Sequence, residues 1–181
     1  MASLCGQKII VMSDHLDELC QFYEKFGYSD RLIALLESGM NLERKNKTIY
    51  TELGAKYAKY RPDKLMDFIR AFNTHITIPK LIRVCEQYML WSEAVFLHGV
   101  FDQQDQAILT MIDHSPTAWR HDVFCQNIVN VANHDLFYKA ILFYMEEEPM
   151  LLTDILKLLS NKIDLTQTVQ IVKRTGNIAL I

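Results

Sequence analysis

The sequence predicts an all-α protein built from stacked antiparallel helical hairpins. Three observations indicate this class: apolar residues recur at helical spacing along nearly the whole chain, prolines stand where helices would begin, and the predicted turns are short. The β-branched run Ile76-Thr77-Ile78 is too brief and too isolated to build a sheet.

Helical spacing is clearest in four stretches, where apolar side chains lie three or four residues apart with polar residues between them. These are Leu16, Leu19, Cys20, Tyr23 and Phe26; Leu81, Ile82, Cys85, Tyr88 and Met89; Phe137, Ala140, Ile141, Tyr144 and Met145; and Leu151, Leu152, Ile155, Leu158 and Leu159. Each stretch therefore predicts a helix with one buried face.

Prolines and glycines divide the chain into these helices. Proline suits the first helical turn, because its missing N–H would have no intrahelical partner there. The prolines predicted to open helices are Pro62, Pro79, Pro116 and Pro149. The glycines predicted near helix ends are Gly27, Gly39, Gly99 and Gly176. Asp164 with Gln167 resembles a capping box, whereas Gly54 lies inside a helical pattern and costs about 1 kcal/mol relative to alanine.

These signals predict roughly ten helices of about 10–15 residues joined by short turns, which force consecutive helices to lie antiparallel. A faint repeat places a small alanine before an aliphatic residue, where two helices of a hairpin would approach closely. It occurs at Trp91-x-x-Ala94-Val95, Gln104-x-x-Ala107-Ile108 and Phe137-x-x-Ala140-Ile141. Its period varies, so we expect a degenerate α-solenoid, with residues 1–181 forming a single segment.

Both ends of the chain are apolar, with KIIVM at residues 8–12 and NIALI at residues 177–181. A complete solenoid needs polar capping helices to shield its stacked core. We therefore expect an excerpt from a longer solenoid.

Composition narrows the function classes. Half of the 181 residues are hydrophobic and 23% are charged, and the net charge of -3 gives no basic field for nucleic acid. The four cysteines (Cys5, Cys20, Cys85 and Cys125) form no C-x-x-C pair, which fits a reducing compartment. No apolar run is long enough to insert into a membrane, and Asp14, Asp17 and Glu18 interrupt any signal-peptide core. We expect a cytosolic protein.

Several stretches resemble the clathrin heavy chain, in the same order and over almost the whole length. They are TELGAKYAKYRPDKLM (residues 51–66), IPKLIRVCEQYMLWSEAVFL (residues 78–97), VAN and DLFYKAI (residues 131–133 and 135–141) and PMLL (residues 149–152). The region that they resemble is the proximal leg, near the hub of the three-legged clathrin assembly.

The resemblance implies a right-handed α-solenoid that acts as a coat scaffold in vesicle formation and endocytosis, on the cytosolic face of coated pits and vesicles. It implies packing against other clathrin heavy chain legs, a homotrimer in the full-length protein, and binding of the clathrin light chain along the leg. Because the family's trimerisation element has no counterpart here, we expect this chain to be monomeric.

Two positions differ from the family pattern and mark a divergent member. Glu146-Glu147-Glu148 precedes Pro149, where a basic residue is expected, and Thr168-Val169-Gln170-Ile171 replaces an aromatic-containing stretch. Acidic residues at a helix C-terminus oppose the helix dipole, which is a mild indication of a basic partner; a solvated helix end is the plainer interpretation.

Candidates for chemistry are weak. His121 and Cys125 are four residues apart and would share a helix face, as half of a zinc site, but no second pair stands near them. Asp102 and Asp105 fit a helix N-terminus, where carboxylates suit the dipole. No phosphate-loop, dinucleotide-binding, nucleophile-elbow or zinc-protease motif occurs, so we predict no catalytic residue, no cofactor and no metal.

The candidate partner-binding residues are basic and lie close together in sequence: Lys56, Lys59, Arg61 and Lys64. They would form a basic face near one hairpin, and Lys59 matches a basic position on the light-chain side of the family. An ordinary solvated stripe is the alternative. The alternative function is that of a different cytosolic solenoid adaptor, which binds peptides or helices. A third class, a helical enzyme, would need titratable groups that converge in one pocket.

Overall fold

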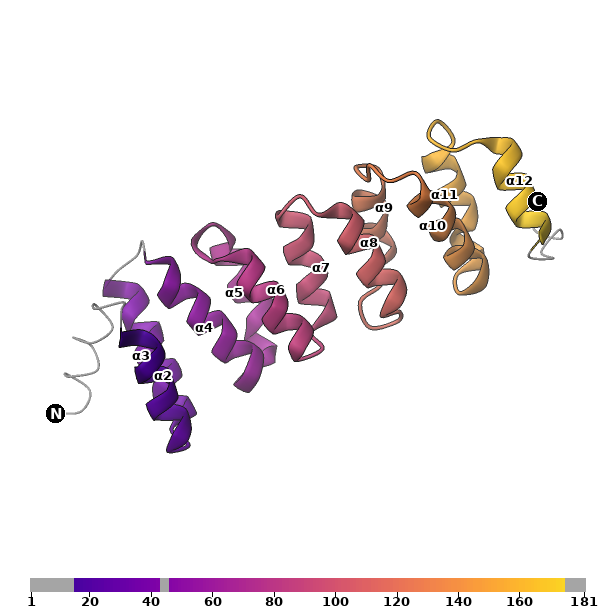
Figure 1. The fold of residues 1–181 in the computed structure, drawn as a ribbon. Helices are drawn as coiled ribbons and strands as arrows, with labels where there is room; N and C mark the ends of the chain where they lie inside the picture. The colour runs from indigo at the N-terminus through magenta and orange to yellow at the C-terminus, as the bar shows by residue number, and fades with distance from the viewer. Residues whose placement is uncertain (1–14, 43–45, 175–181) are drawn as a thin grey trace. The chain divides into compact units, whose positions relative to one another are not determined.

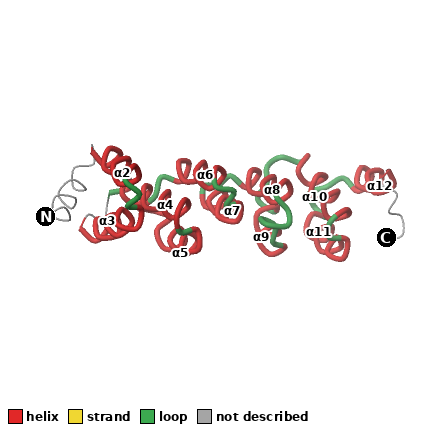
Figure 2. Tube along the Cα trace, turned by 90° about the horizontal axis from the view of Figure 1, so that it is seen from below, coloured by secondary structure: helices red, strands yellow, loops and turns green. Residues whose placement is uncertain are grey.

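The structure, a computed structural model, describes residues 15–42 and 46–174. Outside the described residues lie the two apolar ends, at residues 8–12 and 177–181, together with Cys5 and Gly176. The described part is helical with short connections and contains no strand, which confirms the predicted all-α class (Figures 1 and 2).

The α-helices range from 8 to 14 residues in length, and two short 3-10 helices, η2 and η3, have three residues each. In chain order they are α2 (Leu16–Lys25), α3 (Ser29–Leu42), α4 (Lys47–Tyr60), α5 (Pro62–Phe72), η2 (Asn73–His75), α6 (Ile78–Gln87), α7 (Trp91–Val100), α8 (Gln104–Asp113), α9 (His121–Ile128), α10 (Asp135–Glu146), η3 (Pro149–Leu151), α11 (Leu152–Leu159) and α12 (Leu165–Arg174).

The chain divides into two compact units, with the boundary between Leu97 and His98 inside α7. In the first unit, α3 packs against α2 and α4, and α4 also packs against α5 and α6. In the second unit, α8 packs against α9 and α10, while α10 also packs against α11 and α12. Each unit is thus a set of packed neighbouring helices, as expected for solenoid repeats, and the single segment over 1–181 stays a prediction.

The alanine repeat is confirmed as a packing device. Ala94, Ala107 and Ala140 are all 0% exposed, and the aliphatic residue that follows each of them is also buried. A methyl side chain at these places lets a neighbouring helix come close, so the repeat marks the core face of α7, α8 and α10.

Three of the four prolines stand where the sequence predicted. Pro62 and Pro79 occupy the first turns of α5 and α6, and Pro149 opens the short 3-10 turn η3 before α11. The prediction for Pro116 is wrong: it follows a cis peptide bond in the turn after α8, and α9 begins only at His121.

Helix ends differ from the glycine pattern. Gly27 has φ of +74° after α2, as predicted. Gly39 and Gly99 also lie near helix ends, in the last turns of α3 and α7, but within these helices and not at a left-handed position after them. The left-handed positions after α6 and α7 are instead Met89 and Asp102, with φ of 57° and 56°. The capping prediction at Asp164 holds in part, because its Oδ1 accepts from the N–H of Thr166 at 2.7 Å.

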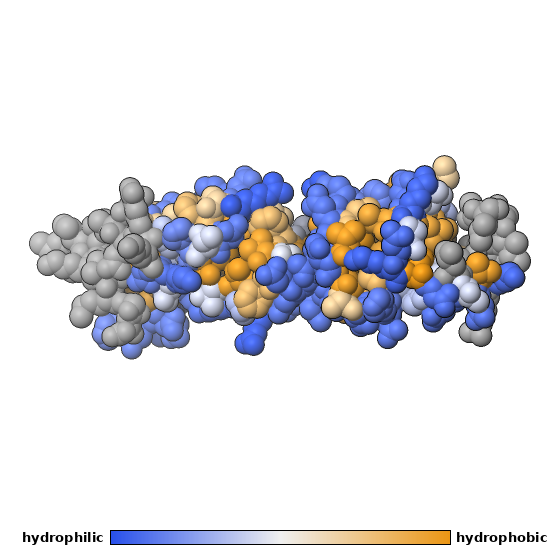
Figure 3. Space-filling model, turned by 90° about the horizontal axis from the view of Figure 1, so that it is seen from above, coloured by the Kyte–Doolittle hydropathy of each residue, from blue (hydrophilic) through white to orange (hydrophobic). Residues whose placement is uncertain are grey.

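The hydrophobic side chains on the surface are gathered in separate patches. On the face drawn in Figure 3, apolar side chains gather in patches bordered by hydrophilic ones. The large hydrophobic side chains that are exposed include two predicted for helix faces, Phe26 (55% exposed) and Met89 (73% exposed), which fall just beyond the ends of α2 and α6. Of the described helices, none combines the length and the apolar composition needed to cross a membrane.

Candidate partner-binding surface

The four predicted binding residues come from one helical corner of the first unit. Lys56 and Lys59 lie on α4, Arg61 is the residue between α4 and α5, and Lys64 is in the first turns of α5. The spacing of three between Lys56 and Lys59 places them on the same side of α4. The structure therefore brings the cluster to one corner, but it does not leave all four side chains equally available.

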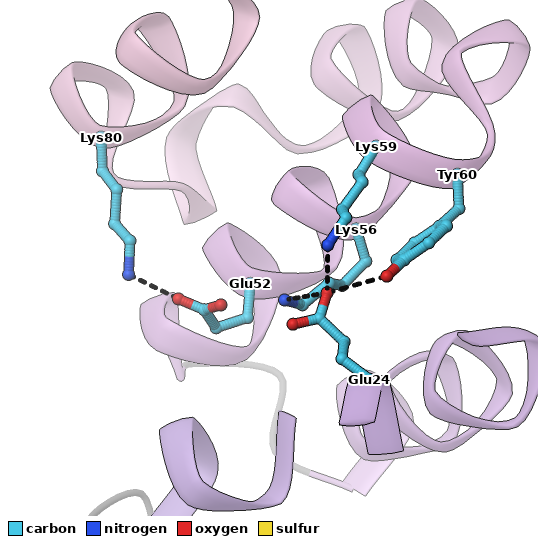
Figure 4. A network of polar contacts seen from close by, with 6 residues as sticks. All are labelled: Glu24, Glu52, Lys56, Lys59, Tyr60 and Lys80. Carbon is cyan, nitrogen blue, oxygen red and sulfur yellow. Dashed lines mark hydrogen bonds and ion pairs between the residues drawn. The ribbon is translucent and has the colours of Figure 1, made fainter. Parts of the chain in front are cut away.

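Lys56 and Lys59 both point toward Glu24 of α2 (Figure 4). Their Nζ atoms donate to Glu24 Oε1 at 3.0 and 3.1 Å, and the hydroxyl of Tyr60 donates to the same oxygen at 3.0 Å. Three donors from α4 thus converge on one carboxylate oxygen of α2. The Lys56 side chain is only 12% exposed and that of Glu24 22%, so this contact is largely shielded from water.

The contacts around Glu24 favour the charged forms of its residues. Burial alone would raise the pKa of Glu24, but the hydrogen bonds from Lys56, Lys59 and Tyr60 outweigh it, and the pKa lies below its ordinary value. The pKa of Lys59 is raised by the neighbouring Tyr60 hydroxyl and by Glu24. The charged forms are therefore the stable ones, and the network stabilises the contact between α2 and α4.

Arg61 and Lys64 are more open. Arg61 donates to Asp30 of α3 at 2.8 Å, with side chains that are 41% and 78% exposed. Water and salt screen ion pairs this exposed, so Asp30 does not hold Arg61 firmly. Lys64 is exposed, and no ion pair within the described residues involves its side chain. Arg61 and Lys64 are the members of the cluster best able to meet a partner.

A second polar contact ties α4 to α6. Lys80 pairs with Glu52, whose side chain is only 8% exposed (Figure 4). Nearby, the Thr51 hydroxyl donates to the carbonyl oxygen of Lys47 and accepts from the N–H of Thr77 at 2.8 Å. Two buried polar residues of α4, Thr51 and Glu52, are thus bonded to Thr77 and Lys80 at the start of α6.

Gly54 explains how α4 and α6 come so close. A Cβ at this position would lie 3.2 Å from both methyl carbons of Leu81 and 3.3 Å from the Phe68 ring. The cost of glycine in a helix is offset by this packing, and α4 continues through Gly54 without interruption. Glycine here provides close helix contact.

The residues that sequence reasoning missed are the partners of the cluster. Glu24 and Asp30 are far from it in sequence, and Lys56 and Glu24 are 32 positions apart. Glu24 directly follows Tyr23, an apolar-face residue of α2, and so lies at the border of that face. The sequence contained one signal for this contact: an acidic residue at the border of the apolar face of one helix, and basic residues at the border of the apolar face of another.

The second unit contains the predicted pair of His121 and Cys125. Cys125 Sγ lies 3.6 Å from His121 Nε2, while His121 Nδ1 is 2.9 Å from the Tyr144 hydroxyl. The ring of Trp119, which is partly buried, packs against Phe143 and Tyr144. Within residues 15–42 and 46–174, no three histidine, cysteine or acidic side chains gather in a way that would hold a metal.

The described cysteines behave as packing residues. Burial raises the pKa of Cys20 to about 11 and that of Cys85 to about 12, so both stay protonated near neutral pH.

Asp105 lies in the first turn of α8, as predicted, whereas Asp102 occupies the left-handed position before it. These residues form no further candidate site.

Comparison with known proteins assigns the family. The clathrin family model, described as a region in clathrin and VPS, matches residues 8–152. The chain is 44% identical to clathrin heavy chain 2 of Oryza sativa subsp. japonica and 42% identical to the clathrin heavy chain of Dictyostelium discoideum over all of its 181 residues. It is 39% identical to human clathrin heavy chain 2 over 99% of its length. The chain spans about 11% of the length of these relatives. It therefore belongs to the clathrin family, as a chain that carries the helical region found in clathrin and VPS proteins.

Proposed function

We propose that this chain is a structural scaffold of a clathrin-type coat, corresponding to the proximal leg, and that it is not an enzyme. The observation that carries the proposal is identity to clathrin heavy chains along the whole chain, 39–44% in rice, Dictyostelium and human relatives. The packed helices and closely fitted core of each unit support a stiff element. Such an element would act on the cytosolic side of coated pits and vesicles, during endocytosis and vesicle transport.

In this role the chain would contact other clathrin heavy chain legs through many weak contacts, whose effects multiply through valency. Weak single contacts suit a coat that must also disassemble. A chimeric clathrin heavy chain, with this chain in place of its homologous region, tests the role. Cage assembly by the purified chimera supports it; triskelia that form but never assemble into cages contradict it.

The same proposal includes binding of the clathrin light chain at the basic corner of the first unit. The ion pairs of this corner support a choice among the four basic residues. Lys56 is largely occupied by Glu24, so the acidic side chains of the light chain would meet Arg61 and Lys64, with the exposed part of Lys59 at the border. Reversing Lys59 would place a second carboxylate against Glu24 and damage the fold, whereas reversing Lys64 disturbs no ion pair of the described residues.

Calorimetric titration of the 181-residue chain with the central helical segment of a clathrin light chain tests this contact. We expect Lys64→Glu to weaken binding about 5- to 10-fold and higher salt to weaken it further, because exposed charges are screened. Arg83→Glu, an exposed cation on α6, is the matched control. Equal affinities for Lys64→Glu, Arg83→Glu and the unmodified chain would contradict light-chain binding at this corner.

We also propose that the chain alone is monomeric. Sedimentation equilibrium across a tenfold range of concentration measures this directly. A constant mass near 21.1 kDa supports the proposal, and a mass that rises to twice this value would contradict it.

A further inference from the structure

The second unit contains a hollow that the coat role does not explain. It has a volume of about 310 Å³ and is formed by α8, the turn after it and α10. Its lining is Ile112, Ser115, Lys139, Leu142, Phe143, Glu146 and Glu147. This volume lies at the lower end of the range for ligand pockets and is suited to one or two inserted side chains.

The lining follows one face of α10. Lys139, Leu142, Phe143, Glu146 and Glu147 have the spacing i, i+3, i+4, i+7 and i+8, so they form a single stripe along the helix. The middle of the stripe is apolar, and Ile112 of α8 adds to it. One end carries a cation and the other end carries two carboxylates.

The negative charges of Glu146 and Glu147 are not balanced by a cation in an ion pair of the described residues. Glu146 and Glu147 stand at the C-terminus of α10, where the helix dipole is already negative. Both side chains are exposed, and no ion pair within the described residues involves them or Lys139. A cationic group placed there would gain from two carboxylates and the helix end together, at a site that an apolar floor partly shields from water.

We propose that this hollow binds a peptide segment of another protein that carries an apolar side chain between one acidic and one basic residue. The apolar side chain enters the hollow over Leu142 and Phe143, the basic residue meets Glu146 and Glu147, and the acidic residue meets Lys139. Seven to eight residues of α10 separate the charged ends, a distance of about 10–12 Å. A helical segment matches it with charges seven or eight positions apart, and we take the bound segment to be helical.

The complementarity favours a peptide over other partners. Two carboxylates at the rim repel nucleic acid and anionic lipid, whereas the bipolar charge pattern selects a chain with both signs at a fixed spacing. This inference does not rest on the coat role or on light-chain binding, because it uses residues of the second unit alone.

The probes are three synthetic 15-residue helical peptides with an alanine and glutamine background. The first has Glu at position 4, Leu at 7 and 8, and Lys at 11 and 12; the second has the order of the charges reversed; the third has Gln at every charged position. Each is titrated into the isotope-labelled 181-residue chain, and backbone amide spectra report where and how tightly it binds.

We expect one of the two charged peptides to shift the amide signals of Ser115 and of residues 139–147, and the third peptide to bind at least about 10-fold more weakly. The double variant Glu146→Gln/Glu147→Gln should lower the affinity about 10-fold, and Leu142→Asp should abolish binding. Asp63→Asn/Asp67→Asn, which alters two exposed carboxylates of α5, is the control and should bind normally. Circular dichroism checks that each variant is folded.

Three outcomes would overturn the proposal. In the first, neither charged peptide shifts the signals of the hollow. In the second, the uncharged peptide binds as tightly as the charged ones. In the third, folded Glu146→Gln/Glu147→Gln binds as tightly as the unmodified chain, which would show that the carboxylates do not recognise the basic residue.

Discussion

The two units of the chain use charge in different ways. In the first unit, ion pairs join separate helices: Glu24 binds two lysines of α4, and Glu52 binds Lys80 at the start of α6. In the described part of the second unit, the ion pair present joins Arg120 to Asp122, two positions away. Helices α9 and α10 are instead held by aromatic rings.

This difference indicates where partners can bind. A charge already paired between two helices must break that pair before it can bind anything else, so it serves stability first. A charge without such a pair loses only its hydration and side-chain freedom when a partner binds, and no contact between helices has to break. Lys56, Lys59 and Lys80 of the first unit are of the former kind, and the acidic end of α10 is of the latter.

The largest expected effect is in the aromatic contact of the second unit. Phe124 is 0% exposed, stacks on Phe143 at 6.2 Å between ring centres and meets Tyr144 edge to face at 5.3 Å. Phe124→Ala should lower the free energy of unfolding by about 3–5 kcal/mol, because it removes a large buried ring and leaves a cavity. Urea denaturation measures the loss, and Phe124→Leu should lose clearly less. A loss under about 1 kcal/mol would contradict the packing described.

A smaller loss is expected where α4 meets α6 in the first unit. Gly54→Val adds a branched side chain against Leu81 and Phe68, whose atoms already lie 3.2–3.3 Å from the position of a Cβ. We expect destabilisation by about 1–3 kcal/mol, seen as a lower melting temperature. In Gly54→Ala the crowding is opposed by better helix propensity, so its change should be smaller. A melting temperature for Gly54→Val equal to that of the unmodified chain would show that the helices have room to spare.

The Glu24 network should give the first unit an acid-dependent stability. The pKa of the Glu24 carboxyl group is lower in the folded chain than in the unfolded chain, where it is about 4.3. The folded state therefore binds fewer protons, so this stabilisation is present above about pH 4.3 and is lost as the pH falls through the folded pKa. Unfolding free energies at pH 7, 5, 4 and 3 should show the unmodified chain and Glu24→Gln converging toward pH 3. A difference independent of pH would contradict this.

The smallest effect is expected at the exposed pair of Asp30 and Arg61. Asp30→Asn should change the free energy of unfolding less than any of the variants above, because both side chains are open to water and salt. Denaturation in low and high salt measures it. A loss as large as that of Glu24→Gln would mean that exposure does not separate the two pairs.

Much of the fold could be predicted from local sequence patterns. Apolar spacing, proline at helix starts and the buried alanines at 94, 107 and 140 reflect forces that act within one or two turns of helix. The same reasoning failed at Pro116, Met89 and Asp102, because the conformation of these turns depends on the packing around them, and residues other than glycine occupy two of the left-handed positions.

The candidate site was less predictable. The basic cluster was visible in the sequence, but not that Glu24 would engage Lys56 and Lys59, since the lysines lie 32 and 35 positions from it. Which side chains meet across helices depends on how the helices pack, and that information is not local. The hollow beside α10 depends in the same way on the approach of α8.

The most direct test compares the unfolding free energies of Glu24→Gln and Glu146→Gln/Glu147→Gln at pH 7. We expect Glu24→Gln to lose about 1–3 kcal/mol, because it weakens three hydrogen bonds between α2 and α4. The double variant should stay within about 0.5 kcal/mol of the unmodified chain. Equal losses in the two variants would contradict the claim that Glu24 serves the stability of the first unit, whereas Glu146 and Glu147 of the second unit remain available to a partner.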